Sequence, residues 1–506
     1  MQFGYVEIGH GTNLGSRIMA ASQSDVKRDL SIVVLSRVVQ MGLLVLTLRA
    51  MTSRLTPTQV GDFSLLVSIS TLFVWPLISP IGLYVNRHTL QWLEDGSIWR
   101  NYLHELLYVF GVAAFAGLTL STWQYFFKPS WAAQFTYLGP AMMSYIVFSV
   151  ANTTIIPAIN LLRLRIAYTI LFTITQLIQL MICWLLTGDS PFGQTWFWGQ
   201  TAGFALGFLV ALPHFLKSTR RIYRIESAPH DYRADLRDVA AFSIPIAVTL
   251  GLNWVQFQSY RFVIGNFVSL KFLGLFFAGY TASGGIMAAF EATATQFFGP
   301  YFYKHVQYAD PDQRHDAWCA YISILYPLML VVITVAITLS SSLAHVLLSK
   351  QFASAGPYIA VGAIVEGIRV LANTYALAAQ ASKRTTILLL PYSIGGGSVA
   401  FVLVGGVSIF GRIAVAPAMV LSALLFLITM HVTMVRHTQK KIRVLGLRWV
   451  IGAGVFLTCL RVLASFLFPP SLLSVNIGLL AIGGLIVGVA CLLIARDALS
   501  VVSEFG

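Results

Sequence analysis

Long apolar stretches recur along the whole chain and limit what it can fold into. Runs of about 18 or more residues with few charges are typical of membrane-spanning helices. Of the 506 residues, 57% are hydrophobic and only 10% are charged, whereas a soluble domain carries about 25% charged residues. Strands of a membrane barrel would alternate in polarity over about ten residues, and these runs do not alternate. The sequence therefore predicts an all-α integral membrane protein.

The apolar runs divide into about fourteen expected spans. They lie near residues 30–51, 63–86, 104–127, 132–160, 166–187, 195–216, 239–265, 271–300, 317–347, 355–381, 385–409, 412–435, 449–467 and 474–495.

The charge of the loops predicts the orientation of the chain. The net charge is +14, which in a soluble protein would indicate nucleic acid. Here the loops and termini expected on one side carry 23 Lys and Arg residues, and the loops on the other side carry five. Because basic loops stay in the cytoplasm, we expect a multi-pass membrane protein with both termini inside. No nucleic-acid partner is expected.

The two longest loops, 217–238 and 436–448, are basic and divide the chain. We expect two lobes of six spans each and two further spans at the C-terminal end. The expected division is a cytoplasmic segment at 1–29, a first lobe at 30–216, a linker at 217–238, a second lobe at 239–435, a loop at 436–448, and two spans with a short tail at 449–506.

An internal repeat supports two related lobes. The stretches LRAMTSRLTPTQVGDFSLL (48–66) and YRFVIGNFVSLKFLGLFFA (260–278) each carry an Arg near the end of a span, a short turn, and Gly-x-Phe at the start of the next span. A second pair of similar segments is NLLRLRIAYTIL (160–171) and AQASKRTTILL (379–389), and each lies at a short basic turn. Both pairs run in the same direction across the membrane, as in transporters built from parallel repeats.

Ionisable residues within the expected spans are few, and seven of them stand out: Arg37, Arg49, Arg261, Glu291, Glu366, Arg369 and Arg461. A charge within the membrane is costly and indicates function. If the first and seventh spans line a cleft between the lobes, Arg37, Arg49 and Arg261 make it positive and suited to a diphosphate, whose oxygens Arg matches bidentately. Alternatively, Arg49 and Arg261 reach the membrane interface from span ends, and Arg37 hydrogen-bonds to a neighbouring helix.

The acidic residues are candidates for ion coupling. Glu366 and Arg369 are spaced i, i+3 on one helix face, so a structural ion pair is expected, although Glu366 could instead titrate. Glu291 has no cation within one turn of its helix, which makes it a candidate for binding a proton or sodium ion. Alternatively, Glu291 lies close enough to the surface to be solvated.

Catalytic and cofactor motifs are missing from the sequence. It contains no Walker sequence, GxSxG, HExxH or CxxC, and its four cysteines lie far apart in apolar runs. We therefore expect no metal, no cofactor and no enzymatic activity.

Three stretches resemble one family of membrane proteins. RLTPTQVGDFSLLVSI (54–69) resembles the segment after the first span of polysaccharide-biosynthesis membrane proteins. SYRFVIGNFVSLKFLGLFFAGYTASGG (259–285) resembles their seventh and eighth spans, and VLLSKQFASAGPYIAVGAIVEGIRVLANTYALAAQASKRT (346–385) resembles their ninth-to-eleventh region. These proteins are the O-antigen and exopolysaccharide flippases, which share a superfamily with lipid II flippases and multidrug exporters.

The resemblance implies transfer of an undecaprenyl-diphosphate-linked oligosaccharide from the inner to the outer leaflet of the bacterial cytoplasmic membrane, by alternating access coupled to proton or sodium entry. It implies a cationic cavity, to which Arg37, Arg49 and Arg261 correspond by position. It also implies partners, namely membrane lipids and a polysaccharide polymerase or other assembly proteins. Many family members carry Asp before the seventh-span Arg, where this chain has Tyr260. That departure favours a free guanidinium at Arg261.

Two other functions stay open at this point. A multidrug exporter of organic cations would share the fold, but it needs cavity carboxylates, and Arg outnumbers acid within these spans. A component of a glycan assembly complex that transports nothing would also fit the sequence.

Overall fold

A computed structural model shows an all-helical chain across the residues that it describes. These are residues 23–502 without 95, 128–134, 136, 163, 223–235, 308–310, 383, 441, 443–445 and 470–471. Some helical side chains, that of Arg37 among them, also fall outside the description. The expected segment 1–29 and the basic loop 217–238 therefore lie largely outside it, as do residues 441 and 443–445 of the basic loop 436–448.

The predicted spans are helices because a bilayer offers no water to bond the backbone, and a helix pairs these groups internally. Within the described ranges, twelve helical segments are long and apolar enough to cross a membrane. One of them, Thr386–Thr438, has 53 residues and is broken near Gly411, where φ is +60°. Counting its two arms separately and adding the helix Gln23–Arg54 gives the fourteen spans expected from the sequence. The predicted fold class is confirmed.

The chain forms two compact units. The first comprises Met1–Leu44 and Leu66–Gly251, and the second comprises Val45–Leu65 and Leu252–Gly506. This division differs from the expected halves because Val45–Leu65 packs with the later part of the chain. The six-part division stays a prediction.

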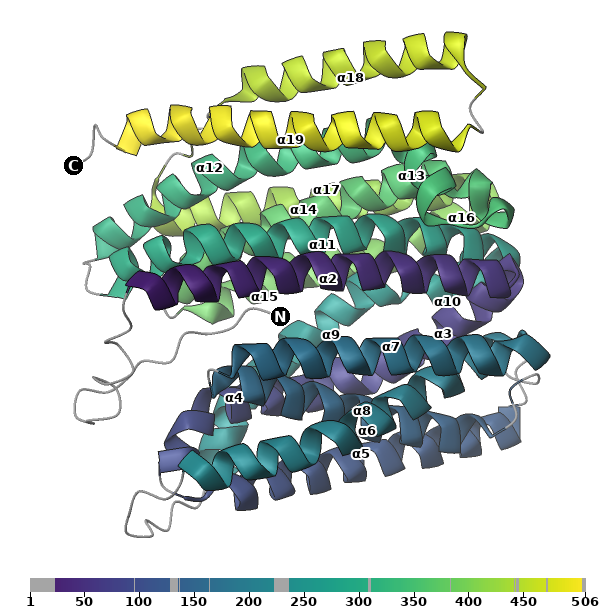
Figure 1. The fold of residues 1–506 in the computed structure, drawn as a ribbon, viewed down its shortest axis with the longest axis vertical. Coiled ribbons are helices and arrows are strands. Elements are labelled where there is room, and N and C mark those ends of the chain that lie inside the picture. Colours follow the sequence, from purple (N-terminus) through teal and green to yellow (C-terminus); the bar gives the residue numbers. More distant parts are fainter. Residues whose placement is uncertain are drawn as a thin grey trace. The chain divides into compact units, whose positions relative to one another are not determined.

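The first unit is built mainly from antiparallel helices joined by short turns (Figure 1). Its elements are η1 (Val74–Ile78), α4 (Ser79–Glu94), α5 (Ile98–Phe127), α6 (Leu138–Leu161), α7 (Arg165–Asp189) and α8 (Gly193–Ile222), with parts of α2 (Gln23–Arg54), α3 (Pro57–Phe73) and α9 (Leu236–Gln258). α6 packs against α4, α5, α7 and α8. A buried aromatic cluster that includes Trp92, Tyr102 and Phe215 fills one end of this unit.

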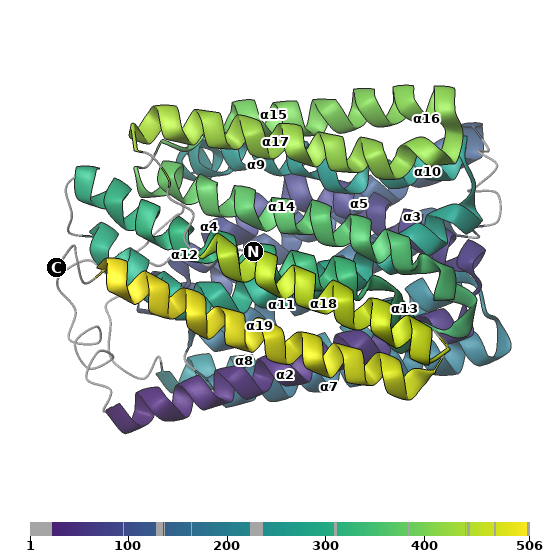
Figure 2. The same cartoon turned by 90° about the horizontal axis from the view of Figure 1, so that it is seen from above.

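The second unit is centred on α14, which packs against α11, α12, α13 and α17. Besides parts of α2, α3 and α9, its elements are α10 (Tyr260–Phe267), α11 (Leu270–Gln307), α12 (Pro311–Thr338), α13 (Ser340–Leu347), η2 (Lys350–Ala355), α14 (Gly356–Ala381), η3 (Thr385–Leu388), α15 (Leu389–Ser398), η4 (Val399–Leu403), α16 (Val404–Phe410), η5 (Gly411–Ala414), α17 (Val415–Thr438), α18 (Leu447–Leu467) and α19 (Leu473–Val502). α18 and α19 pack on α12, while α15 and α16 lie along α17 (Figure 2).

Local chemistry sets the start of α3. Thr56 and Gln59 form a reciprocal cap, in which the Thr56 amide donates to Oε1 of Gln59 at 2.8 Å and the Gln59 amide faces Oγ1 of Thr56 at 3.5 Å. Pro57 occupies the first helical position, where its missing N–H costs nothing. This cap brings Gly61 to the first turns of α3, beside α11.

Candidate functional site

The two Gly-x-Phe motifs of the repeat lie against each other in the second unit. A Cβ built on Gly61 of α3 would lie 2.2 Å from the carbonyl oxygen of Leu270, and one built on Gly274 of α11 would lie 1.7 Å from that of Pro57. Each glycine thus meets the carbonyl four residues before the other glycine. Beside this contact, the rings of Phe63 and Phe277 pack edge to face with centroids 6.3 Å apart. We call this contact of Gly61 with Gly274 the glycine crossing.

Arg261 lies beside the glycine crossing and is buried, with 7% of its surface exposed. Nη1 of Arg261 donates to the carbonyl oxygen of Ser64 at 3.3 Å, and its Cζ lies 4.8 Å from the centroid of the Phe277 ring. A cation over an aromatic face is stabilised by the ring quadrupole. The expectation of a free guanidinium was therefore wrong for this conformation, because Arg261 is engaged by α3 and α11.

Two tyrosines connect Arg261 to the acidic residues. Nε of Arg261 donates to the hydroxyl of Tyr260 at 3.3 Å. The rings of Tyr260 and Tyr280 pack with centroids 5.5 Å apart, and the Tyr280 hydroxyl donates to Oε1 of Glu366 at 2.6 Å. Tyr260, at the position where many resembling proteins carry Asp, is thus a buried link in this chain of contacts.

Arg369 bridges both acidic candidates. Nε of Arg369 donates to Oε2 of Glu366 at 2.7 Å, and Nη2 donates to Oε2 of Glu291 at 3.1 Å. Oε1 of Glu291 accepts a bond of 2.9 Å from the amide of Asn373. The Glu366–Arg369 pair expected from the helix spacing is present, and Glu291 joins it from α11.

This network can hold one more positive charge. Two carboxylates face one guanidinium, so the group carries a net negative charge when both acids are ionised. The side chain of Glu366 is 11% exposed, while those of Glu291 and Arg369 are each 22% exposed. Glu291 is therefore the more accessible of the two acids for an incoming proton or metal cation.

The other predicted cationic residues lie elsewhere. Arg49 is exposed, and its guanidinium donates to the carbonyl oxygens of Val346 and Leu348 at the end of α13. Arg461 likewise donates to the carbonyl oxygen of Thr338 at the end of α12. Both cations cap the negative end of a helix. Arg37 lies in α2, and its side chain is outside the described part of the chain.

Three polar residues of interest were missed from the sequence. Asn373 follows Arg369 by four positions and shares its helix face, a spacing that could have revealed it. Tyr280 carried no such signal, since its partner Glu366 is 86 positions away. Glu105 lies at the edge of the expected span 104–127, but it is buried in α5.

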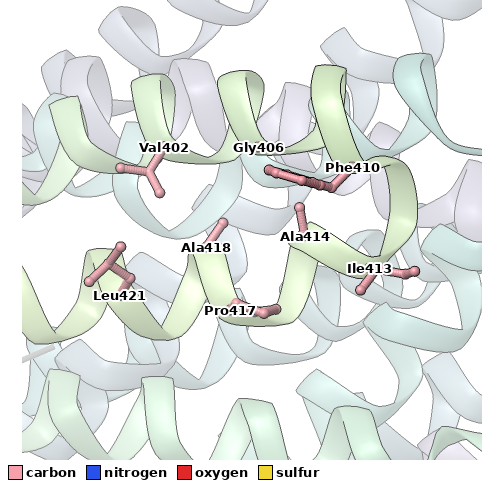
Figure 3. Close-up of a pocket in the computed structure, with 8 residues that line it drawn as sticks. All are labelled: Val402, Gly406, Phe410, Ile413, Ala414, Pro417, Ala418 and Leu421. Atoms are coloured by element: carbon pink, nitrogen blue, oxygen red, sulfur yellow. The ribbon is translucent and has the colours of Figure 1, made fainter.

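A cavity of about 380 Å³ lies between α16 and α17 (Figure 3). All of its lining residues are apolar or glycine: Val402, Gly406, Phe410, Ile413, Ala414, Pro417, Ala418 and Leu421. A site for a polar ligand needs a few convergent polar groups. The apolar lining of this cavity suits an apolar group such as a lipid chain and offers no partner for a charged head group.

Comparison with known proteins places this geometry in a known architecture. No protein-family model and no curated protein matches the chain. Among solved structures, the chain is similar to the lipid II flippase MurJ in an inward closed conformation, with a TM-score of 0.62 and 12% identity over 93% of this chain and 99% of that one.

Two transporters show weaker likeness. An inward-facing multidrug-resistance MATE family transporter of the MOP superfamily has a TM-score of 0.49 with 11% identity, over 79% of this chain and 96% of that one. A eukaryotic MATE transporter has a TM-score of 0.45 with 12% identity, over 85% and 98% of the two chains. The flippase-type architecture that the sequence resemblance implied is confirmed by the match to MurJ, and the chain is a multi-pass membrane protein with the fold of a lipid II flippase.

Proposed function

We propose that this protein moves an undecaprenyl-diphosphate-linked oligosaccharide from the inner to the outer leaflet of the bacterial cytoplasmic membrane, for surface or exopolysaccharide synthesis. The observation that carries the proposal is the end-to-end likeness to a lipid II flippase, with 99% of that chain covered. Such a substrate has an apolar tail that stays in lipid, a charged diphosphate and a polar glycan. The protein has to supply a cation for the diphosphate and a polar path for the glycan.

Arg261 is the proposed ligand of the diphosphate. Its bond to the neutral Ser64 carbonyl is 3.3 Å long, whereas a bond to an ionised oxygen is shorter and about twice as strong. A diphosphate can therefore compete for this guanidinium once the glycine crossing separates. Arg37 and Arg49 are proposed to add positive charge along the path.

The Glu291–Arg369–Glu366 network is proposed to bind the coupling cation. It has a net negative charge that one proton or sodium ion neutralises, and the Tyr280–Tyr260 contact connects it to Arg261. Binding of a cation at Glu291 would weaken the hold of Glu291 on Arg369. In this way the occupancy of the acidic network is linked to the position of the helix that carries Arg261.

Loss of Arg261 is expected to abolish most transport. In a deletion strain, wild type should make the lipid-linked glycan reachable from outside spheroplasts by a membrane-impermeant glycosidase. Arg261→Ala should reduce that exposure about tenfold or more, because a hydrogen bond to a charged group contributes about 1.5–3 kcal/mol. Arg261→Lys should retain part of it, since lysine keeps the charge but not the bidentate fork.

The matched control is Arg412→Ala, which removes an exposed arginine of η5 in the same unit. This variant should transport like wild type. If deletion of the whole protein leaves glycan exposure unchanged, the protein moves a different substrate or none, and drug export or a role in complex assembly replaces the proposal.

A further inference from the structure

The first unit contains a buried acid that the Glu291–Arg369–Glu366 network does not involve. Glu105 of α5 is 4% exposed. Its Oε1 accepts a long hydrogen bond of 3.4 Å from the hydroxyl of Thr154 on α6. Its Oε2 is buried without any hydrogen-bond partner. This oxygen is therefore shielded from solvent and bonded to no polar group of the described residues.

No described cation compensates Glu105. α6 carries no charged residue, and on α4 the guanidinium of Arg87 lies over the Phe242 ring at 5.8 Å while Nδ1 of His88 bonds the backbone of Tyr84. The side chain of Glu94 is outside the described residues. On α5 itself, Arg100, His104 and Tyr108 are exposed, whereas Tyr102 is buried and its hydroxyl pairs with that of Thr89 at 3.1 Å. An ionised carboxylate in this setting would be buried without a counterion, which is strongly unfavourable.

We propose that Glu105 is a proton-binding site of the first unit, and that the folded protein holds a proton on this carboxyl at neutral pH. A neutral acid has far less charge to desolvate than a carboxylate. Gly82 of α4 packs close to the group, since a Cβ built there would lie 3.7 Å from Oε1, at ordinary van der Waals distance. The hydroxyl of Thr154, which is half-buried, donates to Oε1 from the other helix, α6.

A metal cation fits this pocket poorly. Sodium and other hard cations need several oxygen ligands around one point. Here the oxygen that bonds Glu105 is that of Thr154, and no cluster of three or more His, Cys, Asp and Glu side chains occurs among the described residues. A single carboxyl with one hydroxyl is enough for a proton.

Glu105 and the Arg369 network thus differ in chemistry. Arg369 compensates Glu291 and Glu366 as carboxylates, whereas Glu105 has no such partner in the described part of the chain. If the proposed transport is driven by protons, Glu105 would be a second proton site, in the first unit, besides the one proposed for the Arg369 network. That last step rests on the proposed function, but the protonation of Glu105 does not.

The test is infrared difference spectroscopy on the purified full-length protein in detergent at neutral pH. Wild type should show the carbonyl stretch of a protonated carboxylic acid in an apolar setting. Glu105→Gln should lose this band and keep wild-type thermal stability, because an amide matches a neutral acid in shape. The matched control, Glu291→Gln, should keep the band.

The proposal would be overturned by a wild-type spectrum without the band, by a band that survives Glu105→Gln, or by a Glu105→Gln protein that fails to fold. The last would mean that the negative charge itself is required. A band that disappears on adding sodium at fixed pH would also contradict it, since it would assign the site to a metal cation. All of these readouts are independent of whether the protein transports a glycan.

Discussion

Replacement of Arg369 by Met should destabilise the protein by about 3–5 kcal/mol, the typical cost of removing one partner of a buried ion pair. The change leaves Glu291 and Glu366 facing each other without a cation. Thermal unfolding of the purified wild-type and variant proteins measures this loss.

A combined variant and a control isolate the cause. The triple variant Arg369→Met, Glu291→Gln and Glu366→Gln should recover most of the stability, since no buried charge then lacks a partner. Arg412→Met, at an exposed arginine of the same unit, should leave the melting temperature near that of wild type. An Arg369→Met loss that neither Gln substitution reduces would contradict the bridging role of Arg369.

Alanine at either glycine of the crossing should destabilise the protein by about 1–3 kcal/mol, the usual cost of overpacking a close contact. The added methyl group would lie 2.2 Å or 1.7 Å from a backbone carbonyl oxygen. A backbone oxygen cannot move aside as a flexible side chain does, so α3 and α11 have to separate. The double variant, Gly61→Ala with Gly274→Ala, should cost less than the sum of the two, because both methyl groups act on one contact.

Gly452→Ala is the matched control for this prediction. Gly452 lies in α18, and a Cβ built there meets no atom within 4 Å. Alanine at this position should raise stability by up to about 1 kcal/mol, the difference in helix propensity. If Gly61→Ala and Gly274→Ala shift the melting temperature in the same direction as Gly452→Ala, the crossing is not a tight backbone contact.

Most of the architecture could be predicted from the sequence because the bilayer leaves the backbone few choices. Apolar runs of membrane length predicted helices, and helices occupy them. The spacing of Glu366 and Arg369 predicted their ion pair, since i, i+3 neighbours share a face in any helix. The Gly-x-Phe repeat identified two turns as related, and these turns lie in direct contact.

Contacts between distant helices could not be predicted in this way. Glu291 and Arg369 are 78 positions apart, and Arg261 and Ser64 are 197 apart. Helices in a membrane are apolar on most faces, so the pattern along one helix does not indicate which face meets which neighbour. For the same reason Arg49 and Arg261 occupy similar places in the repeat, yet one is exposed at the end of α13 and the other is buried beside Phe277.

The most direct test of the transport claim is reconstitution. The purified protein is placed in liposomes that contain a lipid-linked oligosaccharide with a fluorescent glycan, and an impermeant quencher is added outside. Without a flippase, the quencher should reach only the outer-leaflet half of the fluorescence. With wild-type protein, nearly all of the fluorescence should be lost within minutes, and with Arg261→Ala it should fall to the outer-leaflet fraction. If wild-type vesicles also stop at that fraction under either a proton or a sodium gradient, the protein is not a flippase for this class of lipid.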